Sequence, residues 1–455
     1  MPGSRRQSAR WRERTLWAAM ARICIDAYNL GLPHGSGIAT YARNLQSNIA
    51  AMGHETQILF SSSLDEDATD LMRQVTLLDA GAQAPSNKMR AVIRSLARPP
   101  RLEAWPVPRT SDVITRNIEN WFPPCDRVWA GREVFHKANR SYYAFGWMSP
   151  IRLGDVSETD IAHWTCALPM FEPRAVNIYT LHDLVPLRLP FTTLDNKRGF
   201  YALCQALIAK GDRIFTVSEH SRADIIRMLG APEEKVVNTY QSVEVPAGLL
   251  ETPDDAVAEQ LEAVFDLPWR GYYLFFGAME PKKNVERIIE AYLSSGVSAP
   301  LVIIGGRAWL EERQNDLLYD GLIQRSVLKD GVLKRADRVR KFEYMPFRLL
   351  VSLIRGARAT LFPSLYEGFG LPVLESMLLG TPVLTSSEGS LPEVAGDAAV
   401  LVDPYEVEAI RRGIRELDAD EALRDDLSAR GRLQAAKFSP ERYRERLAEA
   451  YRPFI

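Results

Sequence analysis

Two glutamates, eight residues apart, frame the part of the sequence that is best suited to chemistry. Glu367 and Glu375 lie in the segment FPSLYEGFGLPVLE, on either side of a turn that contains Gly368 and Gly370. A glycine turn that leads into a helix offers free backbone N–H groups and the positive end of the helix dipole, and both attract a diphosphate. Carboxylates beside it can accept hydrogen bonds from hydroxyls. The spacing therefore suits a phosphorylated sugar.

The residues around this turn predict a strand before it and a helix after it. Residues 359–362 form a short apolar run that is typical of a buried strand, and Pro372 suits the first position of a helix. Glu375 is then expected in the first helical turn, and Gly380 with Pro382 should end the helix. Both glutamates should face a crevice at the end of the strand.

Further apolar runs of strand length alternate with helical patterns along both halves of the chain. They cover residues 22–26, 56–60, 176–181 and 213–217, and then residues 272–276, 301–304, 359–362 and 383–386. Strands that are separated by helices predict parallel sheets covered on both faces. We expect an α/β protein with two Rossmann-like, doubly wound domains and a cleft between them.

The length of 455 residues suits two domains. We assign residues 21–245 to the first domain, as the acceptor domain, and residues 246–438 to the second, as the nucleotide-sugar donor domain. Residues 439–455 predict a C-terminal helix, for which packing back on the first domain is one option. Residues 81–150 show no convincing series of strands and are interpreted as an insertion in the first domain. Residues 1–20 predict a disordered basic tail, and Met20 is a candidate start.

Composition narrows the class of protein. No run of about 18 apolar residues is present, so we expect no membrane-spanning helix. Four scattered cysteines without metal-ligand spacing predict a reducing compartment and no structural zinc. All six histidines lie in the first half of the chain, which argues against a histidine-ligated metal near the glutamates. We expect a cytoplasmic protein with no bound metal and no nucleic-acid partner.

Ligands of Rossmann-like sheets bind outside the carboxyl ends of the strands, so the residues after each strand matter most. The sequence GLPHGSG, which contains Gly35, Ser36 and Gly37, follows the first strand and enters a helix. The dinucleotide fingerprint is incomplete there, and a plain tight turn is an equal alternative. His182 follows the strand at 176–181, where a structural histidine held by Asp183 is the alternative.

Two lysines follow the first strand of the second half. Lys282 and Lys283 belong to the segment GAMEPKKN and precede a helix, so they suit phosphate oxygens. A solvated surface pair is the common alternative for adjacent lysines.

Other polar patterns are interpreted as structural. Ser221 with Asp224, and Ser390 with Glu393, have the spacing of a capping box at the start of a helix. The acidic runs at residues 65–67 and 418–420 resemble a DxD metal site, but solvated acids are the preferred interpretation.

Five segments together resemble family 4 of the glycosyltransferases, also called glycosyl transferases group 1, which have the GT-B fold. The segments are GSGIATYARNL, TLHDLVPLRLP, DRIFTVSEHS, EPKKN and PSLYEGFGLPVLESMLLGTPVLTS, and they follow the order of the family from about residue 21 onward. The resemblance implies a retaining, metal-independent enzyme similar to mannosyltransferases.

The resemblance also implies roles for single residues. Glu375 would bind the ribose hydroxyls, Glu367 would hold hydroxyls of the donor sugar, and His182 would lie near that sugar. The implied catalytic residues are Glu367, Lys283 and His182, and the implied donor-binding residues are Gly35, Ser36, Gly37, Lys282, Gly368, Phe369, Gly370, Leu371 and Glu375. One departure is Ala278, where many relatives have an arginine, and Lys282 is the candidate substitute.

The expected reaction moves a hexose, with mannose favoured, from a nucleotide-diphosphate sugar to a saccharide or polyprenyl-linked acceptor in cell-surface polysaccharide synthesis. GDP-mannose is the favoured donor and no cofactor is expected, while UDP-glucose and deoxysugar donors stay open. The alternatives are a nucleotide-sugar epimerase or hydrolase on the same fold, and a noncatalytic sugar-binding subunit.

The basic segment at residues 81–150 suits peripheral contact with the inner face of a membrane, because arginines and tryptophans favour anionic headgroups. Its members are Arg90, Arg94, Arg98, Arg101, Trp105, Trp121 and Trp129. A loop that packs its aromatic residues internally is an equal alternative.

Overall fold

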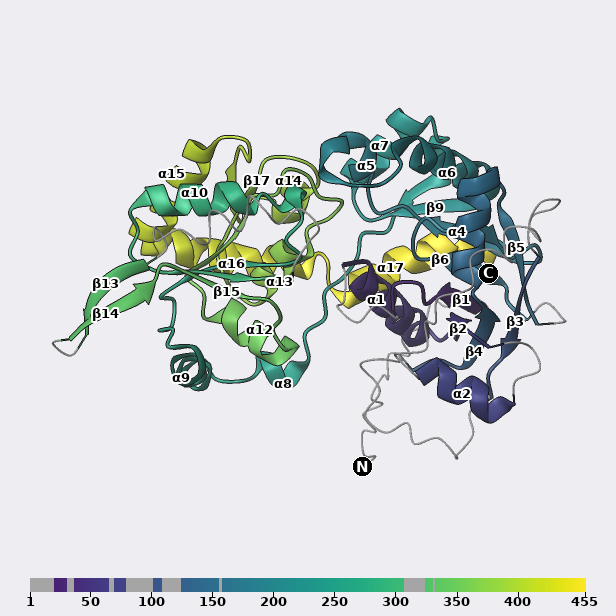
Figure 1. The fold of residues 1–455 in the computed structure, drawn as a ribbon, viewed down its shortest axis with the longest axis horizontal. Helices are drawn as coiled ribbons and strands as arrows, with labels where there is room; N and C mark the ends of the chain where they lie inside the picture. Colours follow the sequence, from purple (N-terminus) through teal and green to yellow (C-terminus); the bar gives the residue numbers. More distant parts are fainter. Residues whose placement is uncertain are drawn as a thin grey trace, which may run out of the picture.

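The computed structural model describes residues 20–30, 37–64, 69–78, 101–108, 124–154, 158–306, 324–329 and 332–455. Several sequence predictions lie outside these residues: the tail before Met20, Gly35 and Ser36 of the glycine loop, the acidic run at 65–67, and Arg90, Arg94, Arg98 and Trp121 of the basic segment. The expected two α/β domains are present (Figure 1).

The first domain is built on a ten-stranded sheet with the order β10-β9-β8-β6-β1-β2-β4-β3-β5-β7. The paired neighbours run parallel except β3 and β4, which are antiparallel. The strands are β1 (Arg22–Asp26), β2 (Glu55–Ser62), β3 (Leu102–Pro106), β4 (Arg127–Arg132), β5 (Ser149–Leu153), β6 (Ile161–Trp164), β7 (Met170–Phe171), β8 (Val176–Thr180), β9 (Arg213–Thr216) and β10 (Val236–Asn238).

Helices connect several of these strands, because parallel neighbours need a crossover connection. They are α1 (Gly37–Ala51), α2 (Asp70–Leu78), α4 (Val134–Phe145), α5 (Val185–Arg188), α6 (Lys197–Lys210) and α7 (Glu219–Leu229), with 3₁₀ turns η1 (Pro190–Thr192) and η2 (Glu233–Lys235).

The second domain has a six-stranded parallel sheet with the order β15-β12-β11-β16-β17-β18, and a separate antiparallel pair, β13 and β14. The strands are β11 (Tyr273–Phe276), β12 (Leu301–Ile304), β13 (Gln324–Lys329), β14 (Val332–Asp337), β15 (Val339–Phe342), β16 (Ala359–Phe362), β17 (Val383–Ser386) and β18 (Val400–Val402). Every residue of β11, β12, β16 and β17 is buried, because helices cover both faces of the sheet.

The helices of this domain lie on both sides of its sheet, with α10 and α15 on one side and α9 and α12 on the other (Figure 1). They are α8 (Ala247–Leu250), α9 (Asp254–Phe265), α10 (Val285–Ser295), α12 (Phe347–Arg355), α13 (Leu371–Leu378), α14 (Leu391–Ala395), α15 (Val407–Ala419) and α16 (Glu421–Ala436), with the 3₁₀ turn η3 (Pro281–Lys283). None of the described helices is both long and apolar enough to cross a bilayer.

The final helix, α17 (Pro440–Tyr451), followed by the 3₁₀ turn η5 (Arg452–Phe454), returns to the first domain and packs beside α1. The buried hydroxyl of Tyr451 is 2.5 Å from Nδ1 of His163, and Nε2 of His163 is 2.8 Å from the hydroxyl of Thr180. Burial and, to a smaller extent, the neighbouring His182 lower the pKa of His163 to about 3, so this imidazole is neutral. Helix α17 therefore completes the core of the first domain.

The predicted insertion at residues 81–150 is wrong for the part that the structure describes. Strands β3, β4 and the start of β5 belong to the main sheet, and α4 packs against it. Trp129 is 1% exposed in β4, where its indole N–H donates to Gln57 over 2.9 Å. Trp105 lies under the Arg73 guanidinium at 5.9 Å. Trp129 is therefore a core residue and does not contribute to a membrane-binding surface.

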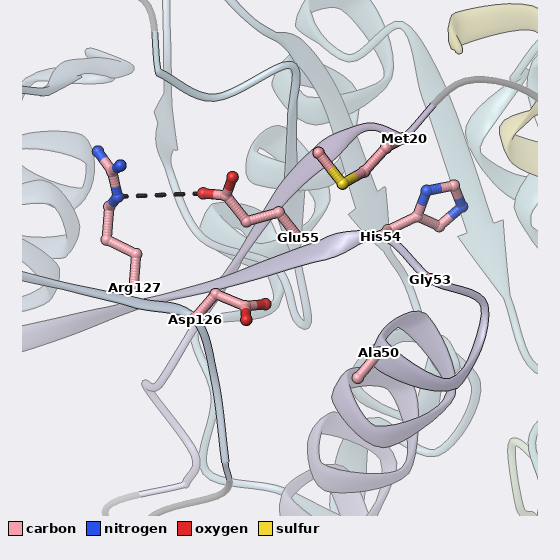
Figure 2. Close-up of a pocket in the computed structure, with 7 residues that line it drawn as sticks. All are labelled: Met20, Ala50, Gly53, His54, Glu55, Asp126 and Arg127. Carbon is pink, nitrogen blue, oxygen red and sulfur yellow. Dashed lines mark ion pairs between the residues drawn. The ribbon is translucent and has the colours of Figure 1, made fainter.

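A pocket lies at the amino-terminal edge of the first sheet, where residues at the beginnings of β2 and β4 line it together with Met20 and His54 (Figure 2). Glu55 and Arg127, the first residues of those two strands, pair across it at 4.0 Å. Ligands of parallel sheets bind at the opposite edge, so this pocket is separate from the glutamate turn.

Candidate active site

The glutamate turn lies at the point where the second sheet changes its winding direction. Strands β11 and β16 are neighbours, and the strands that follow them in the chain continue outward on opposite sides. Such a switch point leaves a crevice at the carboxyl ends of the two strands. The lysine turn follows β11 and the glutamate turn follows β16, so the topology brings both predicted motifs to this crevice.

Glu367 is 6% exposed and pairs with both lysines. Lys283 Nζ donates to Glu367 Oε1 over 2.6 Å, and Lys282 Nζ lies 3.7 Å from Oε2. A backbone bond of 2.8 Å from Leu365 N–H to the Lys282 carbonyl fixes one turn against the other. The alternative of a solvated surface pair is wrong, because both lysine side chains are mostly buried and paired with carboxylates.

Asn284 holds the lysine turn in place. Its backbone lies in the left-handed region at φ 62°, and its side-chain amide donates to the carbonyls of Pro363 and Pro404 over 3.0 and 2.7 Å. One side chain thus joins the loops after β11, β16 and β18, so the lysines keep a fixed position relative to the glutamate turn.

Charge pairing decides the ionisation of this group. Burial alone would raise the pKa of Glu367, but the ammonium groups of Lys283 and Lys282 lower it below the usual range. Burial would likewise lower the pKa of Lys282, and the carboxylates of Glu367, Asp183 and Glu280 raise it instead. The charged forms of Glu367 and Lys282 are therefore the stable ones.

Glu375 lies further into α13 than expected, and its carboxylate has no hydrogen-bond or ion-pair partner among the described residues. Helix α13 begins at Leu371, one residue earlier than expected, so Glu375 is its fifth residue and lies beyond the first turn. Among the described residues, no ion pair or hydrogen bond involves its carboxylate. Burial raises its pKa to about 7, which leaves it close to half-protonated at neutral pH.

The backbone between the two glutamates is held through its carbonyl groups. The Ser390 hydroxyl lies 2.9 Å from the carbonyl oxygens of both Glu367 and Phe369, and it makes no side-chain cap on α14. The capping-box interpretation of Ser390 is therefore wrong. Within the described chain, no acceptor is recorded for the backbone N–H groups of residues 368–371, which are free to bind an anion.

The first domain closes the crevice at Gly368. A Cβ atom on this residue would lie 2.6 Å from the carbonyl oxygen of His182 and 2.9 Å from Cβ of Asp183, so only glycine permits this approach. The Ser221 hydroxyl donates to the Gly368 carbonyl over 3.3 Å, and Lys282 Nζ lies 3.9 Å from Asp183 Oδ2. The predicted residues of the two domains thus meet around one turn.

His182 is oriented by a backbone group and not by Asp183. Its Nε2–H donates to the carbonyl of Thr165 over 2.8 Å, which leaves Nδ1 unprotonated in the neutral ring. The ring packs edge-on against Tyr41 with centroids 4.7 Å apart. Burial is the main cause of its lowered pKa, and Lys282 acts in the same direction. The neutral imidazole of His182 therefore lies beside the group formed by Lys282, Lys283 and Glu367.

The glycine loop is described only at its last residue. Gly37 begins α1, and a Cβ atom there would lie 3.8 Å from Cδ1 of Leu371, the first residue of α13. The amino termini of α1 and α13 therefore approach each other across the crevice, and both helix dipoles favour an anion between them.

Two contacts between the domains are not foreseeable from the sequence. The Glu393 carboxylate accepts hydrogen bonds from the backbone N–H groups of Glu219 and His220, at the start of α7, over 2.9 and 3.2 Å. The buried Tyr366 hydroxyl donates to Asp224 Oδ2 over 2.7 Å. No local pattern signals either contact, because each joins residues of different domains.

The side-chain cap of α7 also differs from the expected one. It is Ser218, whose hydroxyl accepts from the N–H of Ser221 over 3.0 Å. Ser221 is thus a helical residue whose hydroxyl is free to reach Gly368.

The remaining DxD candidate has a structural role. Asp418 pairs with Arg358 and accepts from the Tyr273 hydroxyl, and Asp420 caps α16 by accepting from Leu423 N–H. The interpretation of these acids as merely solvated is wrong. No cluster of three or more potential metal ligands occurs in the described ranges.

The arrangement as a whole suits a dianion that carries hydroxyl groups. Two ammonium groups, the free N–H groups of the glutamate turn and two helix termini favour a diphosphate. The carboxylates of Glu367 and Glu375 suit the hydroxyls at its two ends.

Comparison with known proteins agrees with this chemistry. The family model described as "Glycosyl transferases group 1" matches residues 270–434, which include both glutamates and both lysines. The O-antigen chain mannosyltransferase B of Escherichia coli is 34% identical over 295 residues, which cover 63% of this chain and 72% of that protein. The serotype-specific mannosyltransferase WbdA of Escherichia coli is 28% identical over 286 residues, covering 61% of this chain and only 33% of that longer protein.

Solved structures share the two-domain architecture. HepE from Anabaena, in complex with UDP and glucose, superposes with a TM-score of 0.62 at 13% identity, covering 95% of this chain and 100% of that one. This architecture is the GT-B fold. The family model and the match to O-antigen chain mannosyltransferase B agree with the motif order and with the crevice between two Rossmann-like domains. The chain therefore belongs to the group 1 glycosyl transferases and is a glycosyltransferase.

Proposed function

We propose that this enzyme transfers mannose from GDP-mannose to a hydroxyl of a growing saccharide, with retention of the anomeric configuration. The observation that carries the proposal is the buried group of Lys282, Lys283 and Glu367, set against His182 of the other domain. The mannose preference rests on the names of the relatives, which are mannosyltransferases of O-antigen chains.

The leaving diphosphate is the group that most needs stabilisation. Negative charge grows on it as the bond to the sugar breaks, and fixed cations and N–H groups stabilise that charge without reorganising. In the described structure the two ammonium groups are held by Glu367. An arriving diphosphate competes for them, and Glu367 then accepts hydrogen bonds from the sugar. The lysines and helix termini supply the positive charge, so we propose that no divalent metal is required.

Glu367 orients the sugar and does not attack it. Enzymes that use two carboxyl groups on a glycosidic bond need both of them to flank that bond. Here the second carboxyl, Glu375, lies in the second turn of α13, next to the expected position of the ribose. Its raised pKa fits a carboxyl that becomes fully charged once hydroxyl donors reach it.

The test is turnover with purified protein. GDP-mannose, UDP-glucose and a deoxysugar nucleotide are each supplied with α-mannotriose, with and without chelator, and released nucleotide is measured. We expect GDP release that depends on the saccharide and is unchanged by the chelator, and an α-mannosyl product by NMR.

Each alternative has its own result in this assay. Release of GDP without a saccharide, and without a longer product, would indicate a hydrolase. Conversion of the donor without release of nucleotide would indicate an epimerase. Tight nucleotide binding with no turnover of any donor would favour a noncatalytic subunit.

A further inference from the structure

A group of aromatic side chains lies on the first domain beside the crevice and has no part in donor binding as proposed above. Tyr28 follows β1, and Phe135 and Tyr143 belong to α4, whereas Asp195 precedes α6. Tyr28 is 44% exposed and Tyr143 is 53% exposed, although both rings touch neighbours. We call Tyr28, Phe135, Tyr143 and Asp195 the tyrosine platform.

Direct contacts link the aromatic members of the platform to their neighbours. The rings of Tyr28 and the buried Phe135 meet edge-on with centroids 5.5 Å apart. A Cβ atom on Gly199 would lie 2.9 Å from Cε1 of Tyr143, which places that ring against the start of α6. Burial raises the pKa of the Tyr143 hydroxyl, and Asp195 and Tyr28 are among the neighbours that raise it further. Tyr28 thus contacts α4 through Phe135, and Tyr143 of the same helix meets the start of α6, which Asp195 precedes by two residues.

The platform is continuous with the crevice. The Thr165 carbonyl accepts from His182, and the Thr165 N–H donates to the buried Asp26 carboxylate. The other oxygen of Asp26 accepts from the backbone N–H of Tyr28 over 3.1 Å. Three hydrogen bonds thus lead from the imidazole at the site to the first residue of the platform, and all of them lie at the carboxyl ends of β1, β6 and β8.

The chemistry of the platform favours a neutral ligand that has both C–H faces and hydroxyls. Aromatic faces bind apolar C–H groups, while phenol hydroxyls and a carboxylate bind hydroxyl donors. An anionic lipid headgroup or a nucleic acid would meet the charge of Asp195, which repels it. A saccharide meets all of these requirements.

We propose that the tyrosine platform binds the saccharide acceptor, with Tyr28 and Tyr143 packing against sugar rings next to the one that is extended. This inference rests on the proposed transfer reaction and names a subsite for its acceptor. The lysines and glutamates proposed to hold the donor belong to the second domain, and no residue of the platform is among the proposed donor-binding residues.

The test separates the two substrates. Tyr28→Ala, Tyr143→Ala and the double variant are assayed with GDP-mannose and α-mannotriose, beside Tyr28→Phe and Tyr143→Phe, which keep the rings. We expect each alanine variant to raise KM for mannotriose on the order of tenfold, since one aromatic contact is removed, with KM for GDP-mannose unchanged. The phenylalanine variants should stay within a few-fold. Leu433→Ala, at a side chain 73% exposed on α16, is the matched control.

A direct binding measurement keeps the inference testable if no transfer is found. Saturation-transfer NMR of α-mannotriose with the wild-type protein should show contact with the sugar ring protons, and the double alanine variant should lose it. Equal signals in wild type and double variant, or an unchanged KM for mannotriose, would overturn the platform. A third outcome separates the two proposals. If the wild-type protein turns over no GDP-mannose but the double variant still loses the NMR signals, the transfer proposal is overturned and the platform stays supported.

Discussion

The two ends of the glutamate turn place the same chemical group in opposite electrical surroundings. Glu367 is held by two ammonium groups, which lower its pKa. Glu375, eight residues later, has no recorded partner among the described residues, and burial raises its pKa to about 7. The first carboxyl is part of a preassembled charged group, whereas the second gains its charge and its partners when a ligand arrives.

The difference shows that residue type alone does not set the role of a carboxyl. Loops that converge at a switch point supply cations to one glutamate, whereas α13 half-buries the other glutamate and supplies none. Four predictions test this contrast, and the largest expected effect comes first.

Glu367→Ala should reduce transfer by about a thousandfold or more, because the sugar loses its orienting acceptor and the lysines lose their counter-charge. Released GDP measured against time gives the rate. Glu416→Ala, an exposed change on α15, serves as the control, and circular dichroism should show both variants folded. A Glu367→Ala enzyme with full activity would remove this residue from the site.

Lys283→Ala should lower kcat by about a hundredfold, as expected when one fixed donor to a developing anion is lost. The substitution also removes the ammonium group that does most to lower the pKa of Glu367, so the pKa of Glu367 should rise. Because only the ionised carboxylate is in its wild-type state, the activity of the variant should increase as the pH is raised through this higher pKa. A pH–rate profile of the variant checks both effects, with Lys235→Ala as the control. A flat profile with wild-type kcat would contradict the pairing.

Glu375→Gln should stabilise the free protein by on the order of 2 kcal/mol at about pH 8 and by much less at about pH 4.5. The folded protein holds this proton more tightly than the unfolded chain, whose ordinary pKa is 4.5, so stability falls as the pH rises from there to about 7. Thermal unfolding at the two pH values measures the difference.

The same variant should bind GDP about tenfold more weakly above pH 7, where the wild-type carboxylate accepts from hydroxyls. Equal melting temperatures for wild type and variant at both pH values would mean that Glu375 is not buried in the way described.

Glu393→Gln should raise KM for the donor a few-fold, since a charged cap on α7 contributes roughly 1 kcal/mol to holding the domains together. Small-angle scattering with and without GDP measures the closure of the domains, and Glu416→Gln is the control. Unchanged kinetics and an unchanged scattering profile would show that this contact is incidental.

The four central strands of the second domain could be predicted from the sequence because they are completely buried. Residues 301–304 are wholly apolar, residues 359–362 and 383–386 combine apolar residues with threonine or serine, and the observed strands have the same bounds. Strands β3, β5 and β7 lie towards one edge of the first sheet, where burial is partial and β7 has only two residues. Their sequences carry no continuous apolar run, so the region resembles an insertion.

The convergence of lysines and glutamates could also be predicted, because both follow strands whose carboxyl ends share an edge. The contacts across the domains could not. Gly368 against His182, Glu393 on α7 and Tyr366 on Asp224 depend on how two separately folded sheets face each other, and no local periodicity encodes that.

The return of α17 to the first domain has a consequence for the order of folding. The hydroxyl of Tyr451 satisfies the buried His163, and Tyr443 and Leu447 are fully buried in the same core. During synthesis the first domain emerges early, but these groups reach the solvent outside the ribosome only after the whole second domain has done so. The domain that starts first is therefore completed last, and its early form exposes a hydrophobic groove beside α1 until α17 arrives.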